Sequence, residues 1–397
     1  MSCAVQIAAL RCKCQPIPPG GLPIWSGVPF ASTHVVKRTL FSVALVGLGV
    51  AALGGFEYGD GVPQPPAKEW ARRNDALSRA KIFRGEPFDA GSIDFAADPN
   101  RSVVEPTLTS CKYKPDDVSG TTPKFDCELP SGEKIKVKYS GSKEIPSETA
   151  ATRLLHALGF GADRVSRVDV VRCYGCPIQP FHTRALLEML NLTGHVDKRI
   201  DYSSHRDFKN VSVERNLDGE AIEVGNERGW SFYELGKIDS SRGGATSAEI
   251  DALRLMAVFL HHWDNKSSNQ RLTCAGAKTA DCTHPLAMIQ DVGSEFGPKK
   301  VHIGNWRSKP VWHDSATCLV SMKGMPYNGG TFEDVVISEG GRRLLGERLR
   351  QLSANQIAAL FTAAGLEDVP AWTAAFQDRV RQIVQRPACP ATTKASS

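Results

Sequence analysis

The stretch that decides the fold reads His262-Trp263-Asp264-Asn265-Lys266-Ser267-Ser268-Asn269, and Gln290-Asp291-Val292-Gly293 follows it. The first part supplies a carboxylate at Asp264, an amine at Lys266 and an amide at Asn269. The second part adds the carboxylate of Asp291 shortly before a glycine. Phosphoryl transfer uses these groups: one carboxylate orients a hydroxyl, an amide and a carboxylate hold Mg²⁺, and an amine neutralises charge. The residue types therefore point to this chemistry.

The spacing of these residues resembles the protein-kinase catalytic loop, H-R-D-x-x-x-x-N, and the metal-binding D-F-G. His262, Asp264 and Asn269 occupy the fixed positions of the loop, and residues 291–293 stand for D-F-G. Trp263 replaces the arginine, and a valine replaces the phenylalanine. The chain is thus similar to the protein-kinase-like superfamily over about residues 105–385.

The resemblance implies a role for each residue of the stretch. Asp264 is the expected base and Lys266 lies near the transferred phosphoryl group, while Asn269 and Asp291 ligate Mg²⁺ or Mn²⁺ beneath ATP. Two alternatives stay open. Asp264 could be a surface residue at a helix end, or it could join His261-His262 in a zinc site, although adjacent helical residues diverge by about 100°.

A β-hairpin is predicted ahead of this stretch. Residues 124–129 and 134–139 alternate apolar and polar side chains around a Pro-Ser-Gly turn. Kinases carry a phosphate-gripping lysine on such a strand, so the resemblance assigns that role to Lys138. Lys136 shares its strand face and competes for the role. The alternative is a solvated basic edge strand.

A helix is predicted after the hairpin, with Ser147 as N-cap, an apolar stripe and Gly159 as the stop. By resemblance Glu148 pairs with the strand lysine, although a first-turn carboxylate also favours the helix dipole by itself. Residues 119–122 could cover the phosphates. They contain one glycine, Gly120, where kinases have G-x-G-x-x-G.

Beyond the predicted hairpin and helix, the sequence patterns are clear in some segments and weak in others. Residues 193–245 show few periodic features. Thr246 and Glu249 form a capping box that begins an apolar helix leading into His262. Residues 285–290 read as a buried strand that presents Asp291. Helices are expected at 331–352, broken near Gly340-Gly341, at 353–364 from a second capping box, and at 371–385.

The expected fold class is α+β: a two-lobed protein-kinase-like fold with a small antiparallel-sheet N-lobe carrying one helix, and a mainly helical C-lobe. The expected boundaries are an unstructured or over-long N-terminus at 1–35, a signal peptide or anchor at 36–57, a linker at 58–100, the N-lobe at 101–180, the C-lobe at 181–388 and a tail at 389–397.

Composition limits the possible partners. The 397 residues are 41% apolar with a net charge of +5 and no long basic run, which argues against a nucleic-acid partner other than a nucleotide. No G-x-S-x-G, Walker A or H-E-x-x-H motif is present. The acceptor expected by resemblance is a protein or small-molecule hydroxyl. The oligomeric state is left open.

Two features predict export. Residues 40–56 form an apolar run after a basic segment, as in a signal peptide or anchor that could also bring the chain to a membrane. A buried core helix is the alternative. Eight cysteines follow the run, an even number that suits disulfides. We expect Cys111–Cys127 and Cys274–Cys282 pairs, whereas Cys173 and Cys176 could instead be a redox motif or half of a zinc site.

The function expected from this resemblance is an exported or membrane-anchored atypical kinase that transfers the γ-phosphoryl group of ATP to a hydroxyl, with a protein as the expected acceptor. Location on the cytoplasmic face of a membrane is the alternative. The branches it resembles are secretory-pathway, spore-coat-type, phosphoinositide-kinase-like and bacterial toxin-type kinases. A same-fold transferase acting on lipid or sugar or attaching AMP, and a nucleotide-binding pseudokinase, are the other hypotheses.

Overall fold

The computed structural model describes residues 66–116, 120–276, 278, 282–298, 300–326 and 330–390. The chain divides into two units, Met1–Pro63 and Gln64–Ser397. The predicted export segment at 36–57 and the expected N-terminus at 1–35 lie outside the described residues. Within the described ranges, no helix has the length and apolar character needed to cross a bilayer.

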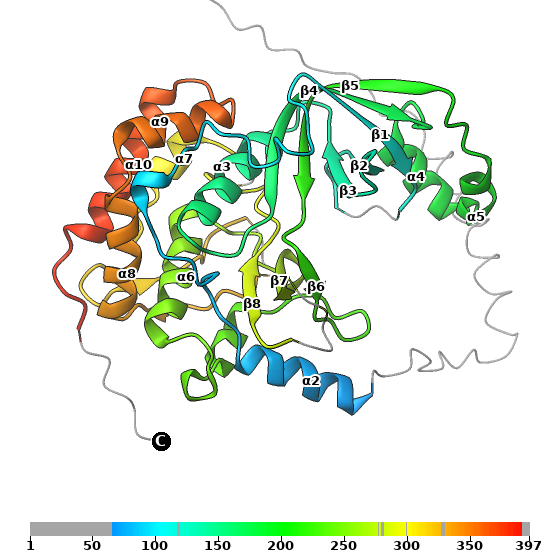
Figure 1. Cartoon of the computed structure of the whole chain (residues 1–397). Coiled ribbons are helices and arrows are strands. Elements are labelled where there is room, and N and C mark those ends of the chain that lie inside the picture. The colour runs from blue at the N-terminus through cyan, green and yellow to red at the C-terminus, as the bar shows by residue number, and fades with distance from the viewer. Residues whose placement is uncertain are drawn as a thin grey trace, which may run out of the picture. The chain divides into compact units, whose positions relative to one another are not determined.

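Five strands form a closed barrel in the order β1-β2-β3-β5-β4 (Figure 1). They are β1 (Leu108–Lys114), β2 (Lys124–Glu128), β3 (Lys134–Lys138), β4 (Arg164–Tyr174) and β5 (His205–Arg215). The predicted hairpin is confirmed as β2 and β3, whose alternate apolar residues fill the barrel. The predicted antiparallel sheet is wrong in one pairing, because β1 and β4 run parallel.

Strand β5 lies in the stretch that sequence patterns left unassigned. It pairs with both β3 and β4, so the barrel extends to Arg215 and the expected boundary at 180 falls too early. Only the second half of β5 is buried, with Val211 and Val213 inside the barrel. The exposed polar first half hides the alternation that would have indicated a strand.

Helix α3 (Glu144–Ala157) begins earlier than expected. Ser147 is therefore not the N-cap. Pro146 is accommodated because a proline in the first turn lacks only an N–H that has no helical partner. The shift carries Glu148 beyond the first turn and turns the Ser147 hydroxyl inward, where it donates to the carbonyl of Val292 at 3.0 Å.

The rest of the described chain is mainly helical, with short sheets (Figure 1). Its helices are α4 (Pro180–Met189), α5 (Thr193–Val196), α6 (Ser247–Leu260), α7 (Ile303–Ser308), α8 (Glu339–Arg350), α9 (Ala354–Ala363) and α10 (Val369–Val384). One sheet joins β6 (Gly219–Ala221), β7 (Gln270–Ala275) and β8 (Pro285–Ile289), and another joins β9 (Leu319–Val320) and β10 (Val335–Val336). Both predicted capping boxes are present, at α6 and α9.

Helix α8 differs from its prediction in two ways. It begins at Glu339, because Ser338 caps it by accepting from the N–H of Gly341. Gly340-Gly341 does not break it. At Gly341 a Cβ would lie 2.4 Å from the Cβ of Asp251, so the glycine is what allows α8 to approach α6 this closely.

The segment expected as a linker packs against the core instead. Helix α2 (Ala67–Ser78) and the chain after it bury Leu77 and Ile82 completely. Arg73 of α2 pairs with Glu234 at 2.9 Å, with both side chains nearly buried. Residues 67–100 therefore form part of the folded unit, because their few apolar residues all face it.

Four disulfides cross-link the described residues: Cys111–Cys127, Cys173–Cys176, Cys274–Cys282 and Cys318–Cys389. The two expected pairs are confirmed. Cys173 and Cys176 bond to each other, which leaves no thiolates for the zinc alternative. Cys389, expected to begin a free tail, is buried and tied to Cys318.

The disulfides should differ in their contribution to stability. Cys318–Cys389 spans 71 residues and Cys173–Cys176 spans 3. In the chain-entropy model, replacing both cysteines by alanine should cost about 4 kcal/mol for the long loop and about 2 kcal/mol for the short one. Urea unfolding of the two double variants measures this difference. Equal losses would contradict it.

Candidate active site

A polar cleft of about 420 Å³ contains most of the residues that the sequence singled out. Barrel residues and residues of the helical part both line it. The expected site residues in its lining are Gly120, Lys136, Lys138, Glu148, Lys266, Asn269 and Asp291. Asp264 is not among them, although its neighbours in the loop are.

A buried ion pair between Lys138 and Glu148 closes one side of the cleft. The Lys138 ammonium lies 2.5 Å from Oε1 of Glu148, with 3% and 2% of the two residues exposed. Burial raises the pKa of Glu148, and the Lys138 ammonium opposes that rise. Burial would lower the pKa of Lys138, but the carboxylates of Glu148, Asp291 and Glu214 hold it well above its usual range. Lys138 therefore stays charged.

Glu214 is a site residue that sequence reasoning missed. It reaches the cleft from β5, with Oε1 3.1 Å from the Lys136 ammonium and Oε2 3.8 Å from that of Lys138. The two candidate lysines thus share Glu214, but Lys138 also pairs with Glu148, the partner expected of a phosphate-gripping lysine. Strand β3 is flanked by β2 and β5, which rules out the solvated edge strand.

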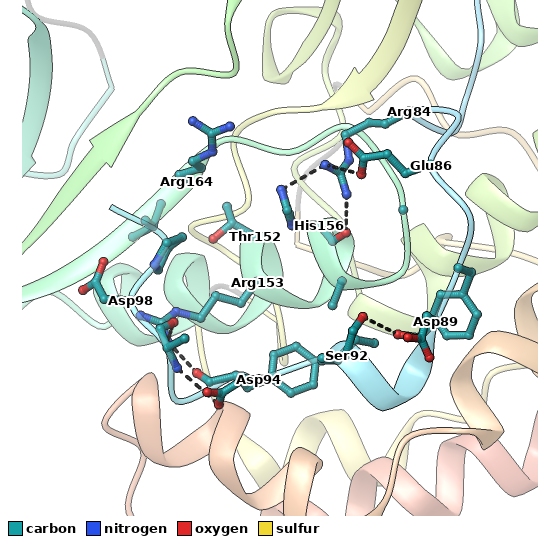
Figure 2. A pocket seen from close by; sticks show the side chains of 18 of the residues that line it. Arg84, Glu86, Asp89, Ser92, Asp94, Asp98, Thr152, Arg153, His156 and Arg164 are labelled. Carbon is teal, nitrogen blue, oxygen red and sulfur yellow. Dashed lines mark hydrogen bonds and ion pairs between the residues drawn. The ribbon is translucent and has the colours of Figure 1, made fainter. Parts of the chain in front are cut away.

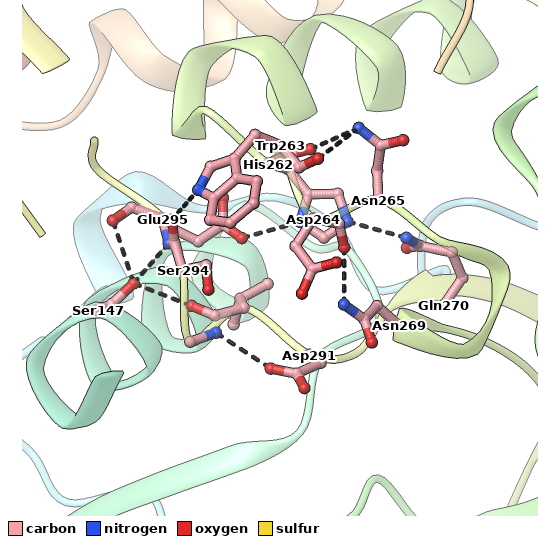
Figure 3. A network of polar contacts seen from close by, with 12 residues as sticks. Ser147, His262, Trp263, Asp264, Asn265, Asn269, Gln270, Asp291, Ser294 and Glu295 are labelled. Carbon is pink, nitrogen blue, oxygen red and sulfur yellow. Dashed lines mark hydrogen bonds and ion pairs between the residues drawn. The ribbon is translucent and has the colours of Figure 1, made fainter. Parts of the chain in front are cut away.

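The loop after α6 is anchored by a buried histidine (Figure 3). His262 contacts Oε1 of Glu295 through Nδ1 at 2.8 Å and the amide nitrogen of Gln270 through Nε2 at 2.9 Å. Because an amide nitrogen only donates, Nε2 accepts and Nδ1 carries the hydrogen given to Glu295. His262 is therefore a structural residue, and its two ring nitrogens are unavailable to zinc.

Asn269 and Asp291 are tied together through the backbone. The carbonyl oxygen of Asn269 accepts from the N–H groups of Gln290 and Asp291, both at 3.0 Å. The Asn269 amide nitrogen donates to the carbonyl of Asp264 at 2.7 Å, which leaves the amide oxygen for another partner. This oxygen and the Asp291 carboxylate are the hard ligands that Mg²⁺ prefers.

Positive charge in the cleft keeps Asp291 ionised. Desolvation by the surrounding protein opposes ionisation of its carboxyl group, but the Lys138 ammonium and the N–H of Gly293 lower the pKa of Asp291 to about 2. Lys124, opposite Lys138 in the strand register, adds to this effect and was missed in the sequence because it stands at the start of its strand. Burial lowers the pKa of Lys124 itself.

Asp264 lies beside the cleft rather than in its lining. Its carboxylate is 3.4 Å from the Lys266 ammonium, and its Oδ1 is buried with no hydrogen-bond donor among the described residues. Glu148 and Glu295 each have one buried carboxylate oxygen, Oε2, that likewise accepts no hydrogen bond from the described residues. Carboxylate oxygens without donors thus gather around this site, where a bound cation or hydroxyl would satisfy them.

Gly120 lies at the opening of the cleft in a left-handed conformation, with φ of 76°. A Cβ there would lie 3.3 Å from the Lys124 ammonium. Residue 119, the first of the expected phosphate-covering loop 119–122, falls outside the described residues. The donor set as a whole fits a nucleotide–metal complex: lysines for phosphates, and an amide and a carboxylate oxygen for the metal.

A polar network connects α3 to the loop that carries Asp264 (Figure 3). The Ser147 hydroxyl accepts from the N–H of Glu295 at 2.8 Å, and the Glu295 side chain holds His262. The helix that carries Glu148 is thereby fixed to the segment that carries Asp291. Glu295 was also missed in the sequence, although it follows residues 291–293 closely.

Comparisons with known proteins give distant matches only. No family model and no curated protein matches the chain. A solved structure described as a Helicobacter pylori proinflammatory kinase, CtkA, is 10% identical with a TM-score of 0.40, covering 71% of this chain and 95% of that one. One described as the golgi casein kinase is 12% identical with a TM-score of 0.32, covering 94% and 95%.

Both of these structures are kinases by their descriptions. The scores are too low to carry any statement about activity. The function proposed below therefore depends on the residues of the cleft.

Replacing Asp291 by asparagine should weaken metal binding. The change removes the ionised oxygen ligand, so Mn²⁺ affinity in the presence of a non-hydrolysable ATP analogue should fall at least about tenfold. Electron paramagnetic resonance of free Mn²⁺ measures this. Asp378→Asn, an exposed aspartate of α10, is the matched control. An unchanged affinity in Asp291→Asn would remove Asp291 from the metal site.

Proposed function

We propose that this chain is an ATP-dependent phosphotransferase of the atypical kinase type, acting on a hydroxyl. The observation that carries the proposal is one cleft in which a buried Lys138–Glu148 pair faces Asn269 and Asp291. The first pair supplies a fixed cation for phosphates, and the second supplies oxygen ligands for a divalent metal. Few other reactions need both sets of groups in one cleft.

Each residue has a separate task in this proposal. Lys138, oriented by Glu148, binds phosphate oxygens, and Lys136 and Lys124 add positive charge. Asn269 and Asp291 hold the metal. Mg²⁺ or Mn²⁺, when bound with ATP, neutralises charge on the phosphates and aligns the γ-phosphoryl group.

The remaining two residues act on the acceptor. Asp264 receives the proton of the attacking hydroxyl through its carboxylate. Lys266 lines the cleft beside it and neutralises charge that develops on the transferred group. The expected acceptor is a hydroxyl on a protein.

We also propose that the protein is exported. Four disulfides in the folded unit suit an oxidising compartment. The apolar run at 40–56 would provide the signal or anchor.

A nucleotide-binding pseudokinase is the second candidate. Asp264 supports it, because this carboxylate is absent from the cleft lining and its Oδ1 is enclosed by protein. A phosphotransferase needs Asp264 to face the acceptor, whereas a binding module does not. Transferases of the same fold that act on lipid or sugar, or that attach AMP, share the residues above and differ in their products.

Changing Asp264 to asparagine separates the two candidates. The variant keeps its shape and polarity but cannot take a proton, so ATP turnover should fall about 10²–10⁴-fold while nucleotide affinity is retained. The measurement is Mg²⁺-dependent formation of ADP and transfer of labelled γ-phosphate to the chain itself or to added protein. Asp239→Asn, on an exposed turn, is the matched control.

A wild-type chain that binds ATP and Mg²⁺ without any turnover would contradict the phosphotransferase and favour the pseudokinase. Turnover that survives in Asp264→Asn would contradict the role of Asp264. Mass spectrometry of the modified product distinguishes phosphate from AMP.

A further inference from the structure

A second cavity, of about 360 Å³, lies between α3, the chain at 84–99 and the start of β4 (Figure 2). None of the residues proposed above to hold nucleotide or metal lines it. Helix α3 contributes Thr152, Arg153 and His156, which follow Glu148 along the same helix. The cavity is therefore a separate space that shares one helix with the active cleft.

Arg153 is a cation of this cavity that is held by backbone carbonyls. Its guanidinium donates to the carbonyls of Phe95 at 2.6 Å and Ala97 at 3.4 Å. Its Nε is buried and donates no hydrogen bond to the described residues. Among those residues, no carboxylate lies within ion-pair distance of the Arg153 side chain. Both bonds to carbonyls are made by Nη1, so Nη2 is the group that can donate a charged hydrogen bond to a ligand, one of the stronger interactions available.

The acidic residues of the cavity are engaged elsewhere. Asp89 accepts a hydrogen bond from the backbone N–H of Gly91, and Asp94 accepts one from the backbone N–H of Ala96. Asp98 accepts from the backbone N–H of Asn100 and from the hydroxyl of Ser166. Glu86 pairs with Arg84. Each of these carboxylates has a partner of its own, but Asp98 and Asp94 also attract the Arg153 guanidinium, so a bound anion competes with them for that cation.

His156 adds a second donor. The Arg84 guanidinium lies 3.0 Å from Nε2 of His156, and since a guanidinium only donates, Nε2 accepts and Nδ1 carries the hydrogen. Burial and the nearby Arg84 and Arg164 lower the pKa of His156 to about 4. The imidazole is therefore a neutral donor at physiological pH.

Apolar side chains complete the lining. They are Phe88, Ile93, Phe95 and Ala157, with prolines at both ends of the loop. A cavity of this volume, apolar with a few converging donors, is typical of a small-molecule site. We propose that this cavity binds a small amphipathic carboxylate, whose charged end contacts Arg153 and whose apolar body lies against Phe88 and Phe95.

Because the cavity shares helix α3 with the cleft, such a ligand would also regulate the cleft. This regulatory part of the inference rests on the proposed function. A ligand held by Arg153 and His156 would brace α3 against the chain at 84–99, and α3 positions Glu148. A second connection runs through Asp163, which lines this cavity and accepts from the Gln290 amide at 3.1 Å. Gln290 lines the cleft and precedes Asp291.

The binding test uses the full chain and the fluorescent probe 2-naphthoate, with neutral 2-naphthamide as the matched probe. We expect saturable binding of 2-naphthoate at least about tenfold tighter than that of 2-naphthamide, because only the carboxylate can use Arg153. Inorganic phosphate distinguishes a general anion site. Phosphate that displaces 2-naphthoate at equal concentration would show that the apolar lining contributes nothing, and would overturn the proposed ligand class.

Two variants locate the binding. Arg153→Gln should lose at least about tenfold in 2-naphthoate affinity, and Ala157→Leu, which fills the cavity without removing a donor, should lose binding as well. Arg381→Gln is the matched control, because Arg381 is an exposed residue of α10, and this variant should bind 2-naphthoate like the wild type. Thermal unfolding checks that each variant folds. Binding unchanged in either folded cavity variant would overturn the assignment.

The regulatory part is measured separately as the affinity for ADP with Mg²⁺, with and without 2-naphthoate. We expect a several-fold change, and the same factor in 2-naphthoate affinity when ADP is added. Identical ADP affinities would overturn the regulation and leave the cavity as a binding site only. A chain that binds 2-naphthoate as described but no nucleotide would contradict the proposed function and not the site.

Discussion

The buried ion pair between Lys138 and Glu148 sets the conditions that the rest of the fold must meet. Removing two charges from water costs several kcal/mol per ion, and their attraction offsets this only when the geometry is good and further partners are present. Closure of the barrel provides one partner, because β5 brings Glu214 beside the ammonium, and Asp291, which follows β8, adds a further negative charge. An exposed lysine is hydrated on any strand, but the buried Lys138 needs the closed barrel to supply partners for its charge.

The same requirement explains the polar network behind the cleft. Glu148 stays in register with Lys138 only if α3 is fixed, and Ser147, on the same helix, is bonded to the backbone of Val292 and Glu295. Glu295 in turn orients His262 at the end of α6. Buried networks of this kind are rigid when their members are satisfied. Of the residues that keep a carboxylate oxygen without a hydrogen-bond donor among the described residues, Glu148 is the one that lines the cleft.

The sequence predicted the parts of this site that lie close together along the chain. The spacing of Asp264, Asn269 and Asp291, the hairpin with its lysines and the two capping boxes all depend on local patterns, and local patterns survive without knowledge of the fold. Glu214 could not be found in this way, because β5 is half exposed and shows no clear alternation. The start of α3 was misplaced because Ser147 has the chemistry of a cap but is used to hold the segment after Asp291. The chain up to residue 100 looked like a linker because of its prolines and scattered charges, although Leu77, Ile82 and Phe95 within it are buried in the core.

The most direct test of this account is a crystal structure with a non-hydrolysable ATP analogue and Mn²⁺, in which anomalous scattering locates the metal. We expect the metal at about 2.2 Å from the amide oxygen of Asn269 and from the carboxylate of Asp291, with Lys138 in contact with a phosphate oxygen. A nucleotide bound elsewhere, or a metal held by other residues while the Lys138–Glu148 pair remains without a phosphate, would contradict the account.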